Sequence, residues 1–119
     1  MGQKQYDLED RTLRFAKDIR TFVKQLSKTI ANIEDSKQLI RSSGSVGANY
    51  IEANESLSKK DFLMRIRISK KEAKESRFWL KLLDIPVRSL EDLRLKYIQE
   101  ATELMVILNA ILVKSESKQ

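Results

Sequence analysis

The side chains best suited to chemistry in this 119-residue sequence are carboxylates, because it contains no histidine and no cysteine. Two glutamate pairs have a spacing that places both members on one helix face, Glu52-x-x-Glu55 and Glu72-x-x-Glu75. Di-iron bundles use such carboxylates together with histidines. Without histidine and cysteine, the usual general base, the thiolate nucleophile, the disulfide and the common zinc ligands are all missing. We therefore expect no catalytic centre, no metal site and no cofactor.

A second candidate is the glycine-containing segment RSSGSVGANYIEA, residues 41–53, which interrupts an otherwise helical pattern. Each glycine costs a helix about 1 kcal/mol relative to alanine. A phosphate-binding loop would need a preceding strand and a Lys-Ser or Lys-Thr after the glycines, and neither is present. We therefore interpret the segment as a helix–helix contact. If the next helix folds back near residues 57–59, facing residue numbers add up to about 116, which sets Gly47 against Ser69 and Gly44 against Ala73.

The same register separates the two glutamate pairs. Glu72 and Glu75 lie level with Gly44 and Arg41, roughly 15 Å from Glu52, so one metal cluster cannot use all four acids. We expect an Arg41–Glu75 ion pair instead, because carboxylates beside an apolar seam need partners. This predicts a polar cluster that acts in folding. Its members are Arg41, Ser43, Ser45, Asn49, Glu52, Glu72 and Glu75.

Basic residues concentrate in residues 59–83, which carry nine basic and three acidic side chains in a chain of net charge +6. Several of them recur at steps of three or four and share one face of a helix. Such a stripe suits phosphate groups, and Phe78 offers a ring on which an unpaired base can stack. We predict an RNA- or DNA-binding surface made of Lys60, Arg67, Lys70, Lys71, Lys74, Arg77, Phe78 and Lys81. The alternatives are that these side chains only solubilise the protein or pair with acids of a neighbouring subunit, and that Phe78 is an interface residue.

The elements that position these side chains are four helices. Apolar and small residues alternate at steps of three and four in four segments, and the single proline and three glycines are too few for an all-β chain. We predict helices over residues 8–28, 33–57, 59–84 and 90–115, with N-caps at Asp7, Asn32, Ser58 and Ser89. Long helices joined by short connections predict one all-α domain over residues 1–119, an antiparallel up-down-up-down four-helix bundle.

The last predicted helix carries the run LMVILNAILV, residues 104–113, which is apolar on every side except at Asn109. Leu104, Leu108 and Ile111 fill a core-facing stripe, so the rest forms a second apolar surface, and such surfaces usually mark interfaces. We predict a homo-oligomer whose interface contains Met105, Val106, Asn109, Leu112 and Val113. The alternative is an unusually wide core stripe.

The chain also carries no predicted membrane or export signal. Ten apolar residues are too few to span a membrane. The N-terminal sequence MGQKQY lacks the apolar core of a signal peptide, and Tyr6 occupies the position at which N-myristoylation requires Ser or Thr. We therefore expect a cytoplasmic protein that does not enter membranes.

Two segments make the sequence familiar. QLIRSSGSVGANYIEA followed by KKEAKESRFWLKLL resembles the family of four-helix-bundle proteins encoded in intervening sequences of bacterial 23S ribosomal RNA genes, sometimes labelled ribosomal proteins. The resemblance spans the chain, with FAKDIRTFVKQL as a weaker match. It implies a four-helix protomer, a ring-shaped homopentamer and no enzyme. It also implies a relationship to the accessory variability protein that partners the reverse transcriptase of diversity-generating retroelements.

These observations favour a non-enzymatic, basic homo-oligomer that binds RNA or DNA. The alternative is a protein-binding adaptor or scaffold, for example an accessory to a nucleic-acid enzyme, and an enzyme without a recognisable centre is the third reading. A salt-dependent RNA gel shift separates the first from the second, because only phosphate binding should weaken steeply with salt.

Overall fold

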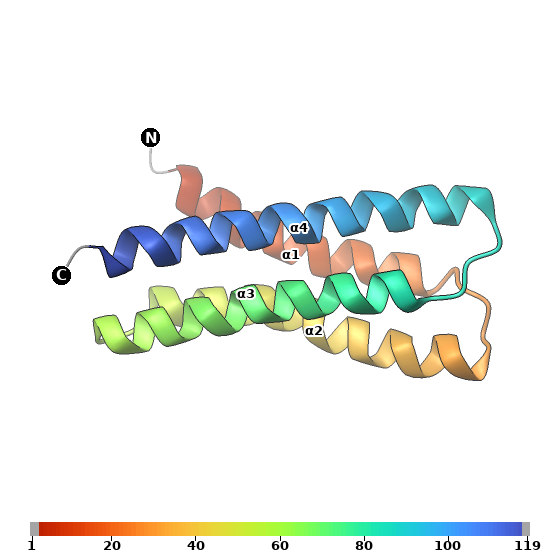
Figure 1. Ribbon diagram of the computed structural model, residues 1–119, viewed down its shortest axis with the longest axis horizontal. Coiled ribbons are helices and arrows are strands. Elements are labelled where there is room, and N and C mark those ends of the chain that lie inside the picture. Colours follow the sequence, from red (N-terminus) through yellow and green to blue (C-terminus); the bar gives the residue numbers. More distant parts are fainter. Residues whose placement is uncertain (1–2, 118–119) are drawn as a thin grey trace.

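The computed structural model describes residues 3–117, and side chains from Leu8 onward. These residues form four helices and no strand: α1 (Gln3–Val23), α2 (Ile30–Asn54), α3 (Lys59–Leu82) and α4 (Arg88–Glu116). Figure 1 shows each helix running along the molecule, with the chain reversing direction at residues 24–29, 55–58 and 83–87. The predicted all-α, four-helix fold is confirmed, with helix ends displaced by several residues. None of the described helices is both long enough and apolar enough to cross a membrane.

Local hydrogen bonds explain where α2 and α3 begin. Ser58 caps α3 as predicted, and its side chain accepts a hydrogen bond from the backbone N–H of Asp61 at 3.1 Å. The predicted cap of α2, Asn32, is wrong. Thr29 takes that role and accepts from the backbone N–H of Asn32 at 3.1 Å. A threonine three residues upstream therefore starts α2 earlier than expected and leaves the Asn32 side chain available for other contacts.

The predicted caps of α1 and α4 are also wrong. Asp7 lies inside α1, because the helix already begins at Gln3. Ser89 lies inside α4, which follows Val87 in extended conformation and has no side-chain cap. The backbone N–H groups of Leu90 and Glu91 instead bond to the Val87 carbonyl at 3.1 and 3.0 Å. Backbone geometry therefore starts α4 before the serine that the sequence offers as a cap.

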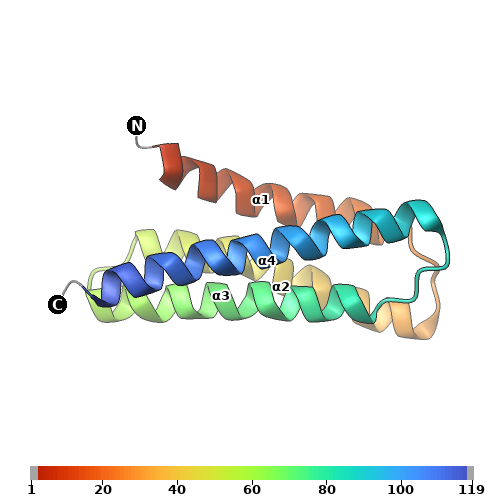
Figure 2. The same cartoon turned by 45° about the horizontal axis from the view of Figure 1, so that its top comes forward.

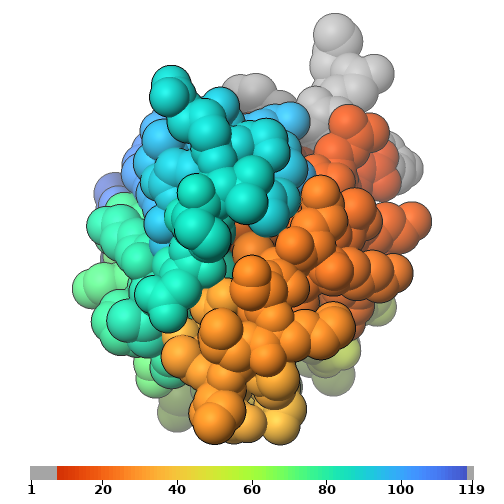
Figure 3. Space-filling model, turned by 90° about the vertical axis from the view of Figure 1, so that its right-hand side faces the viewer, coloured from red at the N-terminus to blue at the C-terminus, as the bar shows by residue number. Residues whose placement is uncertain are grey.

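Asn32 joins the two connections at one end of the molecule. Its side chain is 2% exposed, and its amide donates to the carbonyls of Ser27 at 3.1 Å and Asp84 at 3.0 Å. Its amide oxygen accepts from the backbone N–H of Asp84 at 3.0 Å. Figure 3 shows these connections side by side, the α1–α2 connection in orange and the α3–α4 connection in cyan. One buried amide therefore satisfies three backbone groups that would otherwise lack partners.

The core follows the predicted seams closely. Every position of the seam predicted for the first helix is buried: Leu8, Thr12, Phe15, Ile19, Phe22 and Leu26. Most positions of the seams predicted for the other three helices are buried too. Leu57 is an exception, because it lies in the α2–α3 connection and is fully exposed. In α4 the buried stripe takes Leu112 rather than Ile111, which is only partly buried. The ring of Phe22 meets Tyr97 of α4 edge-on at 5.5 Å between centroids.

Buried serines hold α2 and α3 together. Ser76 donates to the Ser42 hydroxyl at 2.8 Å, and Ser69 donates to the Val46 carbonyl at 2.7 Å. All three serines are 0% exposed. Residue numbers rise along α2 as they fall along α3, close to the register predicted from facing small residues. A side chain of α3 that reaches the backbone of α2 requires the two helices to pack closely.

The role predicted for Gly47 is wrong, because its missing side chain faces α1 and not α3. A Cβ atom at Gly47 would lie 2.8 Å from Oγ1 and 3.1 Å from Cβ of Thr12. At Gly44 a Cβ atom would meet nothing within 4 Å. The two glycines therefore differ: Gly47 permits the close approach of α1 to α2, whereas no contact among the described residues requires Gly44.

Figure 2 shows α1 diverging from α4 toward its N-terminal end. A charged contact bridges the two helices. Arg11 donates to Glu100 at 2.7 and 2.8 Å and to Glu103 at 2.6 Å. The hydrogen bond to Glu100 is the main reason that the pKa of Arg11 is raised. The pKa of Glu103 is lowered, first by a hydrogen bond from Gln99 and then by Arg11. Both shifts favour the charged forms, so Arg11 and Glu103 stay ionised at neutral pH.

The two glycines provide a matched pair of stability tests. Gly44→Ala should stabilise the protein by about 0.5–1 kcal/mol, because alanine favours the helix and meets no neighbour. Gly47→Ala should be destabilising relative to Gly44→Ala, because crowding a packed contact costs about 1–3 kcal/mol. Urea unfolding measures both. Thr12→Ala, which removes the nearer atom, should reduce the penalty at Gly47. Equal stabilities of the two glycine variants would contradict the close contact between α1 and α2.

Candidate nucleic-acid interface

The candidate interface lies on the side of α3 that faces away from the core. Ile66, Ser69, Ala73, Ser76 and Leu80 of α3 are buried. At 3.6 residues per turn, the basic residues one or two positions further along face outward or toward α4. The structure therefore brings the predicted binding residues onto one side of α3. Some of them bind to α4, and the others are exposed without a side-chain partner among the described residues.

Three of the predicted cations are bound to α4. Arg67 pairs with Glu116 at 2.5 Å. Lys70 donates to the side-chain oxygen of Asn109 at 2.8 Å, and Arg77 donates to the Thr102 hydroxyl at 3.2 Å. These partners were not predicted, because they lie in another helix, whose rotation about its axis no local pattern of α3 reveals. These three cations hold α3 to α4.

The remaining lysines are exposed and have no side-chain partner among the described residues. They are Lys60, Lys71, Lys74 and Lys81. Phe78 is 55% exposed, and its ring contacts Trp79 edge-on at 5.0 Å between centroids. The outward face of α3 thus combines unpaired ammonium groups with an accessible aromatic ring, a combination suited to nucleic acid.

The polar cluster between α2 and α3 centres on Arg41. Its guanidinium pairs with Glu72 at 3.3 Å and also with Glu75. The Glu72 carboxylate is the main cause of the raised pKa of Arg41. Glu75 also accepts a hydrogen bond from the Trp79 indole at 3.2 Å. The structure therefore contains the expected Arg41–Glu75 ion pair, with Glu72 as a second partner.

The other predicted cluster members do not all join this group. Asn49 lies further along α2, where its side chain accepts from Arg65 at 3.0 Å and donates to the Ser45 carbonyl at 2.9 Å. Ser43 is buried and donates to the Ile40 carbonyl of its own helix at 3.2 Å. Glu52 is exposed and lies apart from the cluster, because the register places it about three helical turns from Arg41. Arg65, which binds Asn49, was not among the predicted members of the cluster. Within the described residues, no three acids gather as metal ligands would.

The α4 surface is narrower than predicted. Val106 is 65% and Val113 55% exposed, and Asn109 is also exposed. Met105 is partly buried against the core, and Leu112, expected on the interface, is 8% exposed and belongs to the core. Leu95, 55% exposed, lies on the same outward side as the two valines and was not predicted. The apolar outer face of α4 therefore consists of Leu95, Val106 and Val113.

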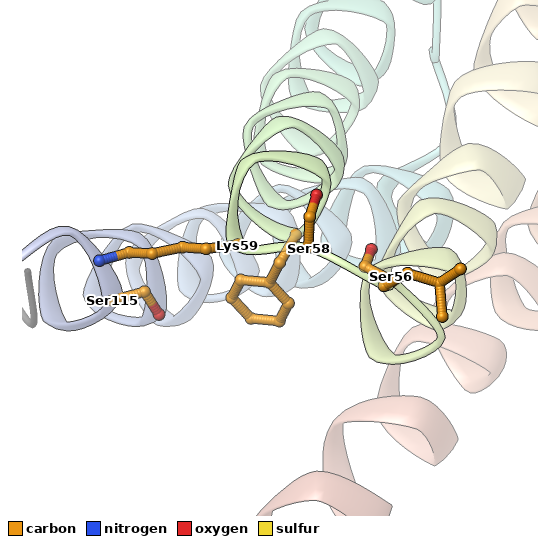
Figure 4. Close-up of a pocket in the computed structure, with 6 residues that line it drawn as sticks. Ser56, Ser58, Lys59 and Ser115 are labelled. Carbon is orange, nitrogen blue, oxygen red and sulfur yellow. The ribbon is translucent and has the colours of Figure 1, made fainter.

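Two surface hollows offer little chemistry. One, of about 400 Å³, is shallow and lies where the α2–α3 connection meets the end of α4. Figure 4 shows Ser56, Ser58 and Lys59 on its connection side and Ser115 on α4. Ser56 and Ser58 are already hydrogen-bonded to backbone groups. The lining offers serine hydroxyls and one ammonium group, and no general base stands beside them, so it does not form a nucleophile–base pair.

The second hollow is a groove of about 680 Å³ between α1 and α4. The Arg11 bridge to Glu100 and Glu103 occupies part of its lining. Burial, followed by the nearby charge of Asp18, raises the pKa of the Tyr97 phenol. The phenol therefore remains protonated at neutral pH and does not act as a general base there.

The comparisons with known proteins agree with this architecture. Residues 4–110 match the model of the 23S rRNA-intervening sequence protein family. The chain belongs to this family. This match confirms the resemblance identified from residues 38–53 and 70–83. The comparison with curated proteins finds no significant match.

This intervening sequence protein is similar to a relative whose structure has been determined by experiment. That structure is the crystal structure of a protein of unknown function from the S23 ribosomal protein family of Bacteroides thetaiotaomicron VPI-5482. The two chains are 32% identical, with a TM-score of 0.77 over 88% of this chain and 97% of that one. The similarity covers almost the whole relative, so the four-helix unit is shared by both proteins.

The Arg41 cluster can be tested by a double-mutant cycle. Arg41→Ala and Glu75→Ala should each lower the melting temperature, with a coupling of about 0.5–1 kcal/mol, because the arginine side chain is 47% exposed and partly screened. The exposed Lys37–Glu34 pair, with side chains 66% and 65% exposed, is the matched control and should show weaker coupling. No coupling between Arg41 and Glu75 would mean that the ion pair does not stabilise the fold.

Proposed function

We propose that this 23S rRNA-intervening sequence protein is a non-enzymatic homo-oligomer that binds RNA or DNA through the outward face of α3. The observation that carries the proposal is the row of exposed, unpaired lysines beside the accessible ring of Phe78. Phosphate groups release condensed counterions when such ammonium groups bind them. Most of the phosphate binding should come from Lys71, Lys74 and Lys81, because the paired cations must first break their contacts with α4.

The homo-oligomeric part of the proposal rests on exposed apolar side chains. The apolar outer face of α4 consists of Leu95 and, further along the helix, Val106 and Val113, which are 55%, 65% and 55% exposed. Ile33 and Ile51 of α2, 41% and 47% exposed, lie on the outward side of α2, and the described residues of α2 do not contact α4. Two different apolar surfaces suit head-to-tail contacts, which close into rings. The family resemblance favours five antiparallel bundles per ring.

The oligomer can be tested by multi-angle light scattering. The wild-type protein should have a mass well above that of one chain at micromolar concentration. Val106→Glu should lower this mass, because it places a charge in an apolar contact without altering the core. Leu57→Glu is the matched control, since Leu57 is fully exposed and belongs to the α2–α3 connection rather than to α4. A monomeric mass for the wild type would refute the oligomer.

The α3 surface can be tested by fluorescence anisotropy with labelled RNA and DNA over a range of salt. Replacing Lys71, Lys74 and Lys81 together by Gln should weaken binding to the α3 surface at least about tenfold at low salt. The slope of log affinity against log salt should fall by about 0.9 for each duplex phosphate that is no longer neutralised, or by about 0.7 for single strands.

A charge-matched control separates a defined surface from general attraction. Replacing Lys37, Arg88 and Lys114 by Gln removes the same charge from scattered exposed positions. It should leave affinity close to that of the wild type. If wild type binds neither nucleic acid at low salt, or if both triple variants behave alike, binding by α3 is refuted.

The competing function is that of a protein-binding adaptor. Phe78 is the observation that favours it, because exposed aromatic residues beside cations also suit acidic protein partners. Co-purification with and without nuclease distinguishes the two functions. A partner retained after nuclease treatment, combined with no RNA or DNA binding by the pure protein, would replace the nucleic-acid function by the adaptor function.

A further inference from the structure

A second basic surface lies on the outward side of α1 and the turn that follows it. Its members are Arg14, Lys17, Arg20, Lys24 and Lys28. All are exposed, and none has a side-chain partner among the described residues. Asp18 is the sole acid between residues 14 and 28. We call this surface the α1 basic face. It shares no residue with the α3 surface.

The fold explains why this face is continuous. Phe15, Ile19 and Phe22 are at most 1% exposed and turn one side of α1 inward. Lys17, Arg20 and Lys24 recur at steps of three and four and share the opposite side. Arg14 lies at the edge of this side, beside the groove between α1 and α4, and Lys28 follows in the connection. Lys24 continues the row, because its backbone N–H bonds to the Arg20 carbonyl at 3.3 Å as in the preceding helix. The result is a row of positive charges about one helical turn apart.

Helix stabilisation accounts for only part of this row. Arg20 and Lys24 lie near the C-terminus of α1, where cations interact favourably with the helix dipole. That effect fades beyond the last turn, so it does not explain Arg14 or Lys17. The basic residues of α3 that α4 holds, Arg67, Lys70 and Arg77, have partners within the subunit, whereas the α1 row has none among the described residues.

The surroundings of the α1 basic face identify its partner by chemistry. One large apolar side chain, Leu13, is 54% exposed one helical turn before Lys17, and no other is exposed from there to Ile30. Membrane-surface helices need an apolar side to insert, and protein interfaces depend on buried aromatic or apolar anchors at their centre. The phosphate backbone of a nucleic acid needs only cations.

The two basic surfaces lie on different sides of the subunit. Both α1 and α3 pack against α2 and α4, but the described residues of α1 and α3 do not meet. Figure 2 shows these two helices on opposite sides of the bundle. One short nucleic-acid segment on the outward side of α3 therefore does not reach the α1 basic face.

We infer that the α1 basic face is a second, sequence-independent binding site for the phosphate backbone of RNA or DNA, separate from the α3 surface. One subunit then holds two segments of nucleic acid. The inference extends the proposed function, but it rests on its own residues and fails or succeeds independently of α3.

The test compares lysine triples of equal charge. Replacing Lys17, Lys24 and Lys28 by Gln leaves Arg20 in the last turn of α1, so the helix dipole keeps its cation. The triple Lys71, Lys74 and Lys81 and the scattered triple Lys37, Arg88 and Lys114, each changed to Gln, serve for comparison. Each variant is titrated with short labelled RNA duplexes over a range of salt, with helicity and oligomer mass measured in parallel.

Wild type should bind twice as many short duplexes per subunit at saturation as either surface variant. The α1 triple should also lower the salt slope by about 2 to 3, and the scattered triple should change neither quantity. Replacing Lys17, Lys24 and Lys28 by Arg should preserve binding, because arginine keeps the positive charge at each position. Combining the α1 and α3 triples should abolish binding.

The outcomes separate the two surfaces. If the α1 triple binds like the scattered triple, the α1 site is refuted while the α3 proposal stands. If the α1 triple loses binding and the α3 triple does not, the α3 proposal is refuted and the α1 site stands. Polyglutamate and phosphatidylserine vesicles are the competing probes. Binding of either one in an α1-dependent way, with no α1-dependent binding of RNA or DNA, would overturn the inference.

Discussion

The close contact between α2 and α3 is the constraint on which the rest of the structure depends. Serines and an alanine line it, and the Ser42–Ser76 and Val46–Ser69 hydrogen bonds satisfy hydroxyls that are fully buried. Sliding one helix past the other would break both bonds, and it would leave the buried hydroxyl of Ser69 without its acceptor, which is costly in the interior. Small size permits the approach, and hydrogen bonding selects one register.

That register determines the surface chemistry of α3. It sets Arg41 against Glu72 and Glu75, and it turns the basic side of the helix outward and toward α4. The basic residues of α3 are thereby divided into two groups. Some cations become structural bonds to α4, and others remain available to solvent. Arg94 of α4 adds a further link, because it donates to the carbonyl of Leu80 at 3.2 Å and so satisfies the end of α3.

Helix α1 is attached by a different kind of contact. Gly47 lets Thr12 approach α2, and Arg11 bridges to α4. These contacts use the inward and lateral sides of α1, so its outward cations pair with no acid among the described residues. Periodicity alone indicated each of the four helices, and the buried seam of α1 follows the prediction at every position. It could not indicate which cations would be neutralised, because the neutralising groups come from distant segments.

Spacing along one helix was sufficient to predict the four helices, the Ser58 cap and most of the buried seams. Family membership was identified by the resemblance of residues 38–53 and 70–83 to known members. Facing small residues also indicated the α2–α3 register and the Arg41–Glu75 pair. Only the packing of the helices against one another settles that Gly47 faces α1 and that Leu112 belongs to the core. Periodicity tells which side of a helix is apolar, whereas the rotation and tilt of its neighbours decide which side chains meet.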